Sequence, residues 1–480
     1  MFQAITYCAL FLICVTVCAT VRSRGVRQTV LLIASYVLYL TWGRWFIAVL
    51  LASTVINFLI GKWLRRNPSP GPLTIGIVFN VVLLASFKDL PEVAVQLPFS
   101  SLQGLAHVLL PLGMSFWTFQ ALSYLFDLYR GDELDPTLPE FALYMAFFPV
   151  TISGPICRMP EMLTQFQSDR TTAWADIREG FRRIMIGIFM MQVANLLGQG
   201  LMGGDGIDSG FNRLSQWSGA DVWCLAFGYG LQLFFDFAGY SHIAVGAAKA
   251  LGFEIPENFA RPFQSTSTSI FWTRWHMSLS FWIRDYIFLP LATARREIWW
   301  RNLSLVISMT LFGVWHRASV LFVVWGAYHG ILLVLHRVVQ QIERKTDREP
   351  PGLIWTPLSW AVTITLISFG WIFFRANTFA QARQMCAALS SPLSYSSHFL
   401  SGNLYFLVFG VAAAYAITLI VIDRLGTRSE KPSSDQGMAA AFARWRWYWL
   451  PPLFILALVL LLIATLTQSA STAQFMYNKF

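Results

Sequence analysis

Charged residues are what this sequence lacks most, because Asp, Glu, Lys and Arg make up only 12% of its 480 residues. A soluble globular protein carries about 25%, so a water-soluble two-domain protein is disfavoured. Hydrophobic residues reach 56%, with 40 Phe and 20 Trp among them. Aromatic side chains in such numbers are typical of helix contacts and of the membrane–water interface. The composition predicts one continuous membrane-embedded body.

Several chemical motifs are also missing. The sequence has no P-loop, no dinucleotide-binding fingerprint, no serine nucleophile elbow and no His/Cys cluster with metal-ligand spacing. None of its six cysteines forms a C-x-x-C pair, and most lie in apolar runs. This usage argues against a disulfide framework and against a zinc site. We therefore expect no bound cofactor and no metal.

The net charge of +10 arises from basic residues in short segments between apolar runs. Arginine-rich and lysine-rich loops of membrane proteins face the cytoplasm and its anionic lipid. No basic stripe interleaved with aromatics appears elsewhere, so we expect membrane lipid and not nucleic acid as a partner. The predicted cytoplasmic loops are 22–27, 62–66, 158–183, 295–301, 337–348 and 423–446. The loops near 89–103, 200–221 and 376–402 are poor in Lys and Arg and are expected on the other side.

Apolar runs predict an all-α, polytopic fold. A spanning helix needs about 20 mostly apolar residues. The candidate spans are 3–21, 28–42, 45–61, 72–88, 104–126, 141–157, 180–199, 221–250, 303–317, 318–337, 357–374, 403–423 and 447–468. Several are too short for a full crossing, so we expect about 11 transmembrane helices together with re-entrant or interfacial helices.

The segment 261–291 is unusual because it places charged residues and His276 among tryptophans. A helical reading puts four large residues on one face at i, i+4, i+7 and i+11: Trp275, Leu279, Trp282 and Tyr286. Two interpretations stay open, an interfacial helix anchored by tryptophan and a helix buried in the protein. If the segment has a role in function, we expect it to line a substrate tunnel, with Trp275 and Asp285 beside the substrate. Arg274 and Arg284 would hold an anionic group there by forked hydrogen bonds.

Two further histidines lie inside apolar helix. His316 lies 13 residues past Leu303, roughly 20 Å inward at ~1.5 Å per residue. His329 lies eight residues before Arg337, roughly 12 Å inward by the same rise. Both imidazoles are thus expected at mid-depth of the bilayer and facing each other across a hairpin.

An ionisable residue at that depth is a candidate functional residue. Histidine suits proton transfer because its ordinary pKa is ~6.5, and a general base has to be neutral. The structural alternative is that each histidine joins two helices by a hydrogen bond. We favour function for His316, expect the preceding Trp315 beside the substrate, and leave both interpretations open for His329. Asp236, in LQLFFDFAGYSHIAVG, either orients an imidazole or bonds the backbone of a broken helix.

At these residues the chain resembles the membrane-bound O-acyltransferase family, in its bacterial alginate O-acetyltransferase-like branch. The similarity lies in FFDFAGYSHIAVG, PENFARPF, FWTRWHMSLSFWIRDYIFLPL and FGVWHRASVLFVVWGAYHG. It extends to QALSYLFDLYRG, FFPVTISGPICR, GWIFFRANTFAQA and the terminal QFMYNKF. The resemblance implies three segments: N-terminal transmembrane helices in 1–100, a catalytic core in 101–375, and a loop with two transmembrane helices in 376–480.

The resemblance implies a ring of helices around a central tunnel in the inner (plasma) membrane of a bacterium. It implies a cytoplasmic acyl thioester as donor, such as acetyl-CoA. The acceptors it implies are an extracytoplasmic protein that takes the acyl group and a polysaccharide. The family's W-H-G histidine corresponds to His316, the R-W-H histidine to His276 and the W-G-x-x-H-G histidine to His329.

The chain departs from the family pattern at two places. Arg317 stands where the pattern has glycine after the catalytic histidine, and Ala292-Thr293 stand where alginate-type members have Gly-Gly. The leading prediction is acetyl transfer to a hydroxyl for O-acetylation of a cell-surface or exported polysaccharide. Two alternatives stay open: transfer of D-alanyl or another acyl group from a carrier protein, and transport of an acyl-lipid or sugar intermediate.

Overall fold

The computed structural model describes residues 2–90, 110–201, 205–213, 216–346 and 355–429. Every regular element in these ranges is a helix, which confirms the all-α prediction. The predicted span 447–468 and the terminal QFMYNKF lie outside the described residues, as does the first part of the predicted span 104–126.

Seven of the described helices are long and apolar enough to cross a membrane. They are α3 (Arg44–Arg66), α4 (Pro70–Lys88), α9 (Trp174–Gln199), α11 (Gly219–Ala250), α16 (Val320–Thr346), α17 (Trp355–Arg375) and α19 (Gly402–Ser429). Further helices of the first half are α1 (Phe2–Thr20), α2 (Arg24–Leu40), α6 (Met114–Arg130), α7 (Leu138–Ala146) and α8 (Met159–Phe166). The chain is a multi-pass membrane protein, while the number of eleven crossings stays a prediction.

The candidate span 141–157 is not one helix, because α7 ends at Ala146 and irregular backbone follows, as the prolines and glycine of FFPVTISGPICR predict. The reason is local: Pro149 and the Gly154-Pro155 pair remove backbone donors and favour non-helical conformations. The carbonyl of Cys157 in this stretch accepts a hydrogen bond from the Tyr144 hydroxyl at 3.0 Å. Irregular backbone is thus buried against α7, as a membrane protein requires.

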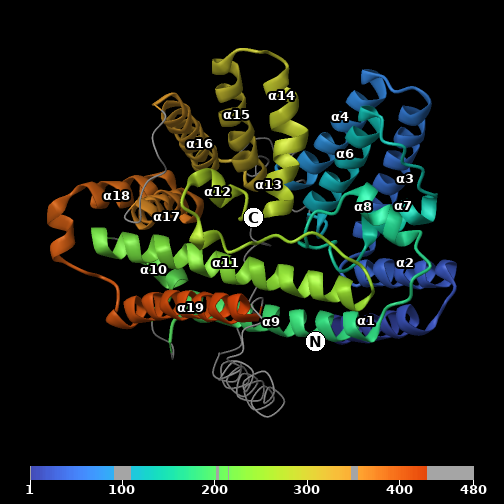
Figure 1. Ribbon diagram of the computed structural model, residues 1–480, viewed down its shortest axis with the longest axis horizontal. Coiled ribbons are helices and arrows are strands. Elements are labelled where there is room, and N and C mark those ends of the chain that lie inside the picture. The colour runs from blue at the N-terminus through green and yellow to red at the C-terminus, as the bar shows by residue number, and fades with distance from the viewer. Residues whose placement is uncertain (1, 91–109, 202–204, 214–215, 347–354, 430–480) are drawn as a thin grey trace, which may run out of the picture. The chain divides into compact units, whose positions relative to one another are not determined.

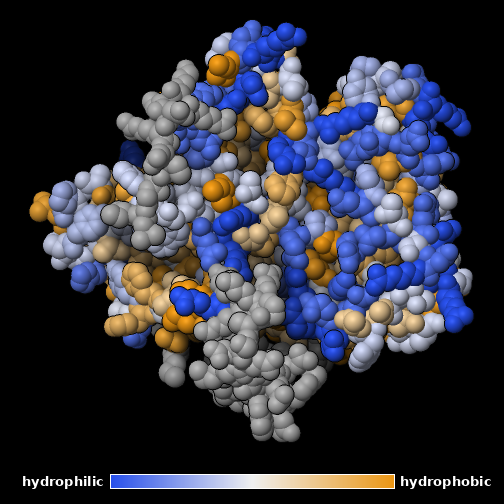
Figure 2. Space-filling view, viewed as in Figure 1, coloured by the Kyte–Doolittle hydropathy of each residue, from blue (hydrophilic) through white to orange (hydrophobic). Residues whose placement is uncertain are grey.

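Helix α4 has an exposed apolar face and a buried face that carries small and polar residues. Ile75, Val78 and Val82 form an exposed apolar stripe, and Figure 2 shows hydrophobic residues reaching the surface at several places on this face of the molecule. Gly76 lies on the buried face, where a Cβ atom would meet Leu125 of α6. Asn80 on the same face donates to the Asn57 side chain of α3 at 2.7 Å. Small and polar residues thus join the helices, as expected in lipid.

Residue contacts divide the chain into two compact units. The first contains Met1–Gly187 and Tyr240–Ile364, and the second contains Ile188–Gly239 and Thr365–Phe480. Helices α9, α11 and α17 contribute to both units. The predicted boundaries at residues 100 and 375 stay a prediction.

In the first unit, α15 (Ile298–His316) and α16 form a closely packed hairpin and lie side by side (Figure 1). Glycines make this approach possible. A Cβ atom at Gly313 would meet the Phe322 carbonyl oxygen, and one at Gly326 would meet the Met309 carbonyl oxygen. The two backbones are therefore in direct contact near the residues that precede and follow the hairpin turn.

The segment 261–291 is not one helix. It divides into η2 (Pro262–Gln264), α12 (Thr268–Trp272), α13 (Met277–Ile283), the π-helical turn η3 (Arg284–Phe288) and the start of α14 (Leu289–Thr293). The break falls at His276, whose φ of 44° lies in the left-handed region. The predicted common face is nevertheless buried, with Trp275, Leu279, Trp282 and Tyr286 each no more than 4% exposed. The segment therefore packs inside the protein, in line with the second interpretation.

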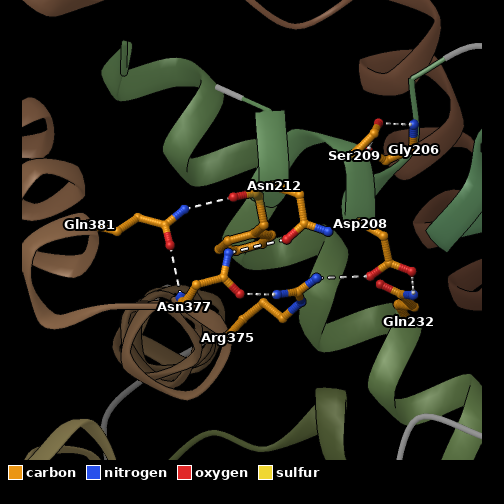
Figure 3. Close-up of polar contacts among 9 residues, drawn as sticks. Gly206, Asp208, Ser209, Asn212, Gln232, Arg375, Asn377 and Gln381 are labelled. Atoms are coloured by element: carbon orange, nitrogen blue, oxygen red, sulfur yellow. Dashed lines mark hydrogen bonds and ion pairs between the residues drawn. The ribbon is translucent and has the colours of Figure 1, made fainter. Parts of the chain in front are cut away.

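The second unit contains two helices in stretches expected to be loops, α10 (Ile207–Arg213) and α18 (Phe379–Ser390). Polar contacts connect α10 to the end of α17 and the start of α18 (Figure 3). Arg375 donates to Asp208 at 3.2 Å, and Gln381 donates to the Phe211 carbonyl at 2.7 Å. Polar contacts between distant segments hold these short helices, and hydrophobic periodicity in the sequence therefore does not indicate them.

Candidate functional site

His316 is the last residue of α15 and is 5% exposed. Aromatic rings surround its imidazole, with ring centroids at 4.7 Å for Trp315, 5.0 Å for Phe312 and 5.6 Å for Trp325. Such an apolar shell favours the neutral imidazole that a general base needs. The position at a helix end places the ring where the chain leaves regular structure, beside the hairpin turn.

His329 lies on α16 and is fully buried. Its ring contacts Trp325 at 4.9 Å and Trp272 at 5.2 Å. Neither ring nitrogen has a hydrogen-bond partner among the described residues. The structural alternative of a histidine that joins two helices by a hydrogen bond thus finds no support in this part of the chain. His316 and His329 both contact the Trp325 indole, so the hairpin does bring the two imidazoles into one aromatic cluster.

His276 is 2% exposed and has a strained left-handed backbone, a conformation that costs about 1–3 kcal/mol for a non-glycine residue and is common at functional sites. Asn258 holds this conformation. Its carbonyl accepts from the Met277 amide at 2.8 Å, and its side-chain oxygen accepts from the Ser278 hydroxyl at 2.6 Å. Its amide donates to Ser241 at 3.1 Å. Sequence reasoning missed Asn258, although it lies in the PENFARPF segment.

Arg284 and Asp285 belong to an ionic network. Asp285 accepts from Arg158 at 2.6 Å and from Arg284 at 2.7 Å, and its carbonyl accepts from Arg130 at 2.5 Å. Burial alone would raise the pKa of Asp285, but the bonds from the Arg284 and Arg158 guanidinium groups outweigh it and hold the pKa below its ordinary value of 3.8. Asp285 is therefore a fixed anion that orients arginines, and its predicted substrate contact stays a prediction.

A cavity of about 430 Å³ opens beside the histidine cluster. Trp272 and Phe312 belong both to its wall and to the aromatic shell of the histidines. Three arginines also line it, namely Arg284, Arg301 and Arg337. The cavity thus combines a cationic lining with an apolar side next to the imidazoles.

The lining of this cavity does not include Arg274, Trp275 or Asp236. The Arg274 carbonyl accepts from the Ala260 amide at 3.0 Å. Trp275 packs between Phe259 and Phe271, with ring centroids at 5.1 and 5.3 Å. Asp236 is buried in the second unit, on α11, which is a continuous helix and not the broken one considered above. The predicted binding roles of all three stay predictions.

Lys88 is a site residue that sequence reasoning missed. It ends α4, yet its ammonium group donates to the main-chain carbonyl of Trp315 and lies 4.9 Å from the Trp315 ring centroid. Its charge is close enough to interact with the His316 ring. No local pattern pairs residues so far apart in the sequence, although a lysine at the end of an apolar run was visible.

The backbone conformation at Arg317 does not require glycine, which the family motif has at this position. Its φ of −158° and ψ of 134° describe extended backbone that any residue adopts. Its side chain is exposed. The departure from the family motif therefore leaves the backbone next to His316 unstrained.

No group of three His, Cys, Asp or Glu residues suited to a metal occurs within the described ranges.

Comparison with known proteins gives the same family as the sequence motifs. Residues 99–377 match the membrane-bound O-acyltransferase family. The chain is 35% identical over 382 residues to the "Probable alginate O-acetylase" of Pseudomonas aeruginosa, covering 76% of this chain and 70% of that protein.

Two other relatives act on different polymers by their names. The peptidoglycan O-acetyltransferase of Helicobacter pylori is 30% identical over 389 residues, which cover 73% of this chain and 71% of that protein. The teichoic acid D-alanyltransferase of Bacillus subtilis is 30% identical over 296 residues, which cover 56% and 69%. The chain therefore belongs to the membrane-bound O-acyltransferase family, in its alginate O-acetylase-like branch, and is an O-acyltransferase.

Proposed function

We propose that this enzyme transfers an acetyl group from a cytoplasmic thioester, such as acetyl-CoA, to a hydroxyl for O-acetylation of an exported or cell-surface polysaccharide. We place it in the bacterial inner membrane. The observation that carries the proposal is the His316 imidazole, which is buried among aromatic rings and separated by Phe312 from a cavity lined with arginine.

In the proposed reaction, His316 takes the proton of the acceptor hydroxyl while its oxygen attacks the thioester carbonyl carbon. A carbon–oxygen bond forms, the carbon–sulfur bond breaks, and the proton passes from the imidazolium to the departing thiolate. The products are an ester and a free thiol, so no oxidant or other co-reactant is needed. His329 shares the contact with the Trp325 ring that His316 makes, and we propose that His329 and His276 help to hold the reacting groups.

The lining of the cavity supports a phosphate-bearing thioester as donor. Guanidinium groups bind phosphate oxygens through paired hydrogen bonds. Arg301 and Arg337 belong to the basic segments that the charge pattern assigns to the cytoplasm. Trp272 and Phe312 line this cavity and also contact His329 and His316, so one side chain stands between the cavity and each imidazole.

Replacing Arg337 with glutamine is expected to raise the KM for acetyl-CoA by about 10-fold, because a hydrogen bond to a charged group contributes about 1.5–3 kcal/mol. The measurement is the release of free CoA thiol by the purified protein at varied donor concentration, with the acceptor present at a saturating level. Arg44→Gln is the matched control, since Arg44 is exposed at the start of α3. An unchanged KM in Arg337→Gln would contradict a donor in this cavity.

The proposal for the acceptor rests on the resemblance to the alginate O-acetyltransferase-like branch. We propose that an extracytoplasmic partner protein accepts the acyl group and passes it to the polysaccharide. The relatives named for alginate and peptidoglycan acetylation favour acetyl, and the relative named for D-alanylation keeps D-alanyl as the alternative. Membership of an acyltransferase family disfavours the transporter alternative.

The test is a product measurement in a deletion strain with and without the restored gene. Mild alkaline treatment of the envelope polysaccharide releases ester-bound groups, which are then quantified as acetate and D-alanine. Acetate that depends on the restored gene supports the proposal. Gene-dependent release of D-alanine without acetate would replace the proposal with the alternative. If neither acetate nor D-alanine depends on the gene, the proposal is overturned.

A further inference from the structure

We propose that Lys88 is a positioning residue for the acyl transfer reaction, which holds the last turn of α15 and thereby the His316 imidazole. The inference rests on the proposed function of His316. It concerns a residue from another helix, 228 positions earlier in the sequence, and it gives a role to the basic end of α4.

The first contact is a helix cap. The last four carbonyl groups of an α-helix have no partner within the helix. In α15 the Trp315 carbonyl is one of these, and the Lys88 ammonium group donates to it. A cation at this end also interacts favourably with the helix dipole. Lys88 therefore fixes the backbone of the residue directly before His316.

The second contact is with the neighbouring side chain. The Lys88 nitrogen lies 4.9 Å from the centroid of the Trp315 ring, a cation–π distance. The Trp315 ring in turn lies 4.7 Å from the imidazole of His316 and 5.2 Å from the ring of Phe119. Lys88 thus contacts both the main chain and the indole that flank the imidazole, so its removal loosens the last turn of α15, which ends at His316.

The charge itself has a further use. An uncharged donor would satisfy the Trp315 carbonyl, whereas a partly buried ammonium at the end of an apolar helix has a desolvation cost. When a hydroxyl attacks a thioester, negative charge develops on the carbonyl oxygen. A fixed cation near the reacting carbonyl favours that charge in the transition state, whereas the same cation opposes positive charge on a neighbouring imidazole. A variant that keeps the donor without the charge measures the balance of these two effects.

The test uses the purified full-length enzyme with acetyl-CoA, the acyl-accepting partner protein and the polysaccharide. Three variants separate the contributions: Lys88→Arg keeps charge and donor, Lys88→Gln keeps a donor only, and Lys88→Met keeps neither. We expect kcat within a few-fold of wild type for Lys88→Arg and roughly 10- to 100-fold lower for Lys88→Met, as for the loss of a charged hydrogen bond. Lys88→Gln should fall between them. The KM for acetyl-CoA should not change.

Lys62→Met is the matched control, because Lys62 is exposed and lies over the Phe58 ring at 4.7 Å. The thermal unfolding midpoint is measured for every variant. If the folded Lys88→Met variant has the kcat of the wild type, the inference is wrong. It is also wrong if Lys88→Met and Lys88→Arg both show a lower unfolding midpoint and lose kcat together, because the loss then reflects stability. Activity in His316→Ala would instead overturn the proposed function, whatever the Lys88 variants show.

Discussion

His316→Ala is expected to lower kcat for acetyl transfer by about 10²–10⁴-fold, the usual contribution of a general base. The reason is that the hydroxyl loses its proton acceptor while the aromatic shell around position 316 persists. The KM for acetyl-CoA is expected to change little, because Phe312 separates the imidazole from the arginines of the cavity. The measurement is the rate of CoA thiol release at saturating donor and acceptor.

The control is His398→Ala, since His398 is exposed and lies in the second unit. It should leave kcat unchanged. Equal unfolding midpoints for wild type and His316→Ala show that the loss is chemical. A folded His316→Ala protein that still acetylates at more than a tenth of the wild-type rate would remove this histidine from the reaction.

Gly326→Ala is expected to destabilise the protein by about 1–3 kcal/mol, a common cost of adding a methyl group to a packed interior. A Cβ atom at this position meets the Met309 carbonyl oxygen and the Thr310 Cα atom, which are backbone atoms and have little room to move. The hairpin would then open near the histidines. We expect a lower thermal unfolding midpoint and a lower kcat together.

Gly410→Ala on α19 is the counterpart. Nothing lies within 4 Å of a Cβ atom built there, and alanine favours helix over glycine by about 1 kcal/mol. The midpoint of this variant should stay the same or rise. If Gly326→Ala were as stable as Gly410→Ala, the close contact between α15 and α16 would not be required for the fold.

The fold was predictable where hydropathy determines structure. Apolar runs of spanning length predicted α1, α4 and α17 to within a few residues, because lipid requires such helices to satisfy their own backbone. The buried face through Leu279 and Trp282 also followed from helical spacing. These predictions depend on neighbours in the sequence.

The remainder depends on contacts between distant segments. Nothing local to Lys88 indicates the Trp315 carbonyl, and nothing local to Asn258 indicates that it holds the backbone of His276. The left-handed conformation of His276 was unpredictable for the same reason, since an L-residue adopts it only when its surroundings enforce it. The site histidines were found because an imidazole in an apolar run is conspicuous, whereas a lysine at a helix end has an ordinary explanation.

The glycine contacts between α15 and α16 have a mechanical consequence. Two helices whose backbones touch at Gly313 and Gly326 cannot slide or rotate against each other without collision. His316 and His329 are carried on this one stiff piece, so their separation is set once, during folding. Any motion that admits a substrate or releases a product has to come from the parts that surround the hairpin.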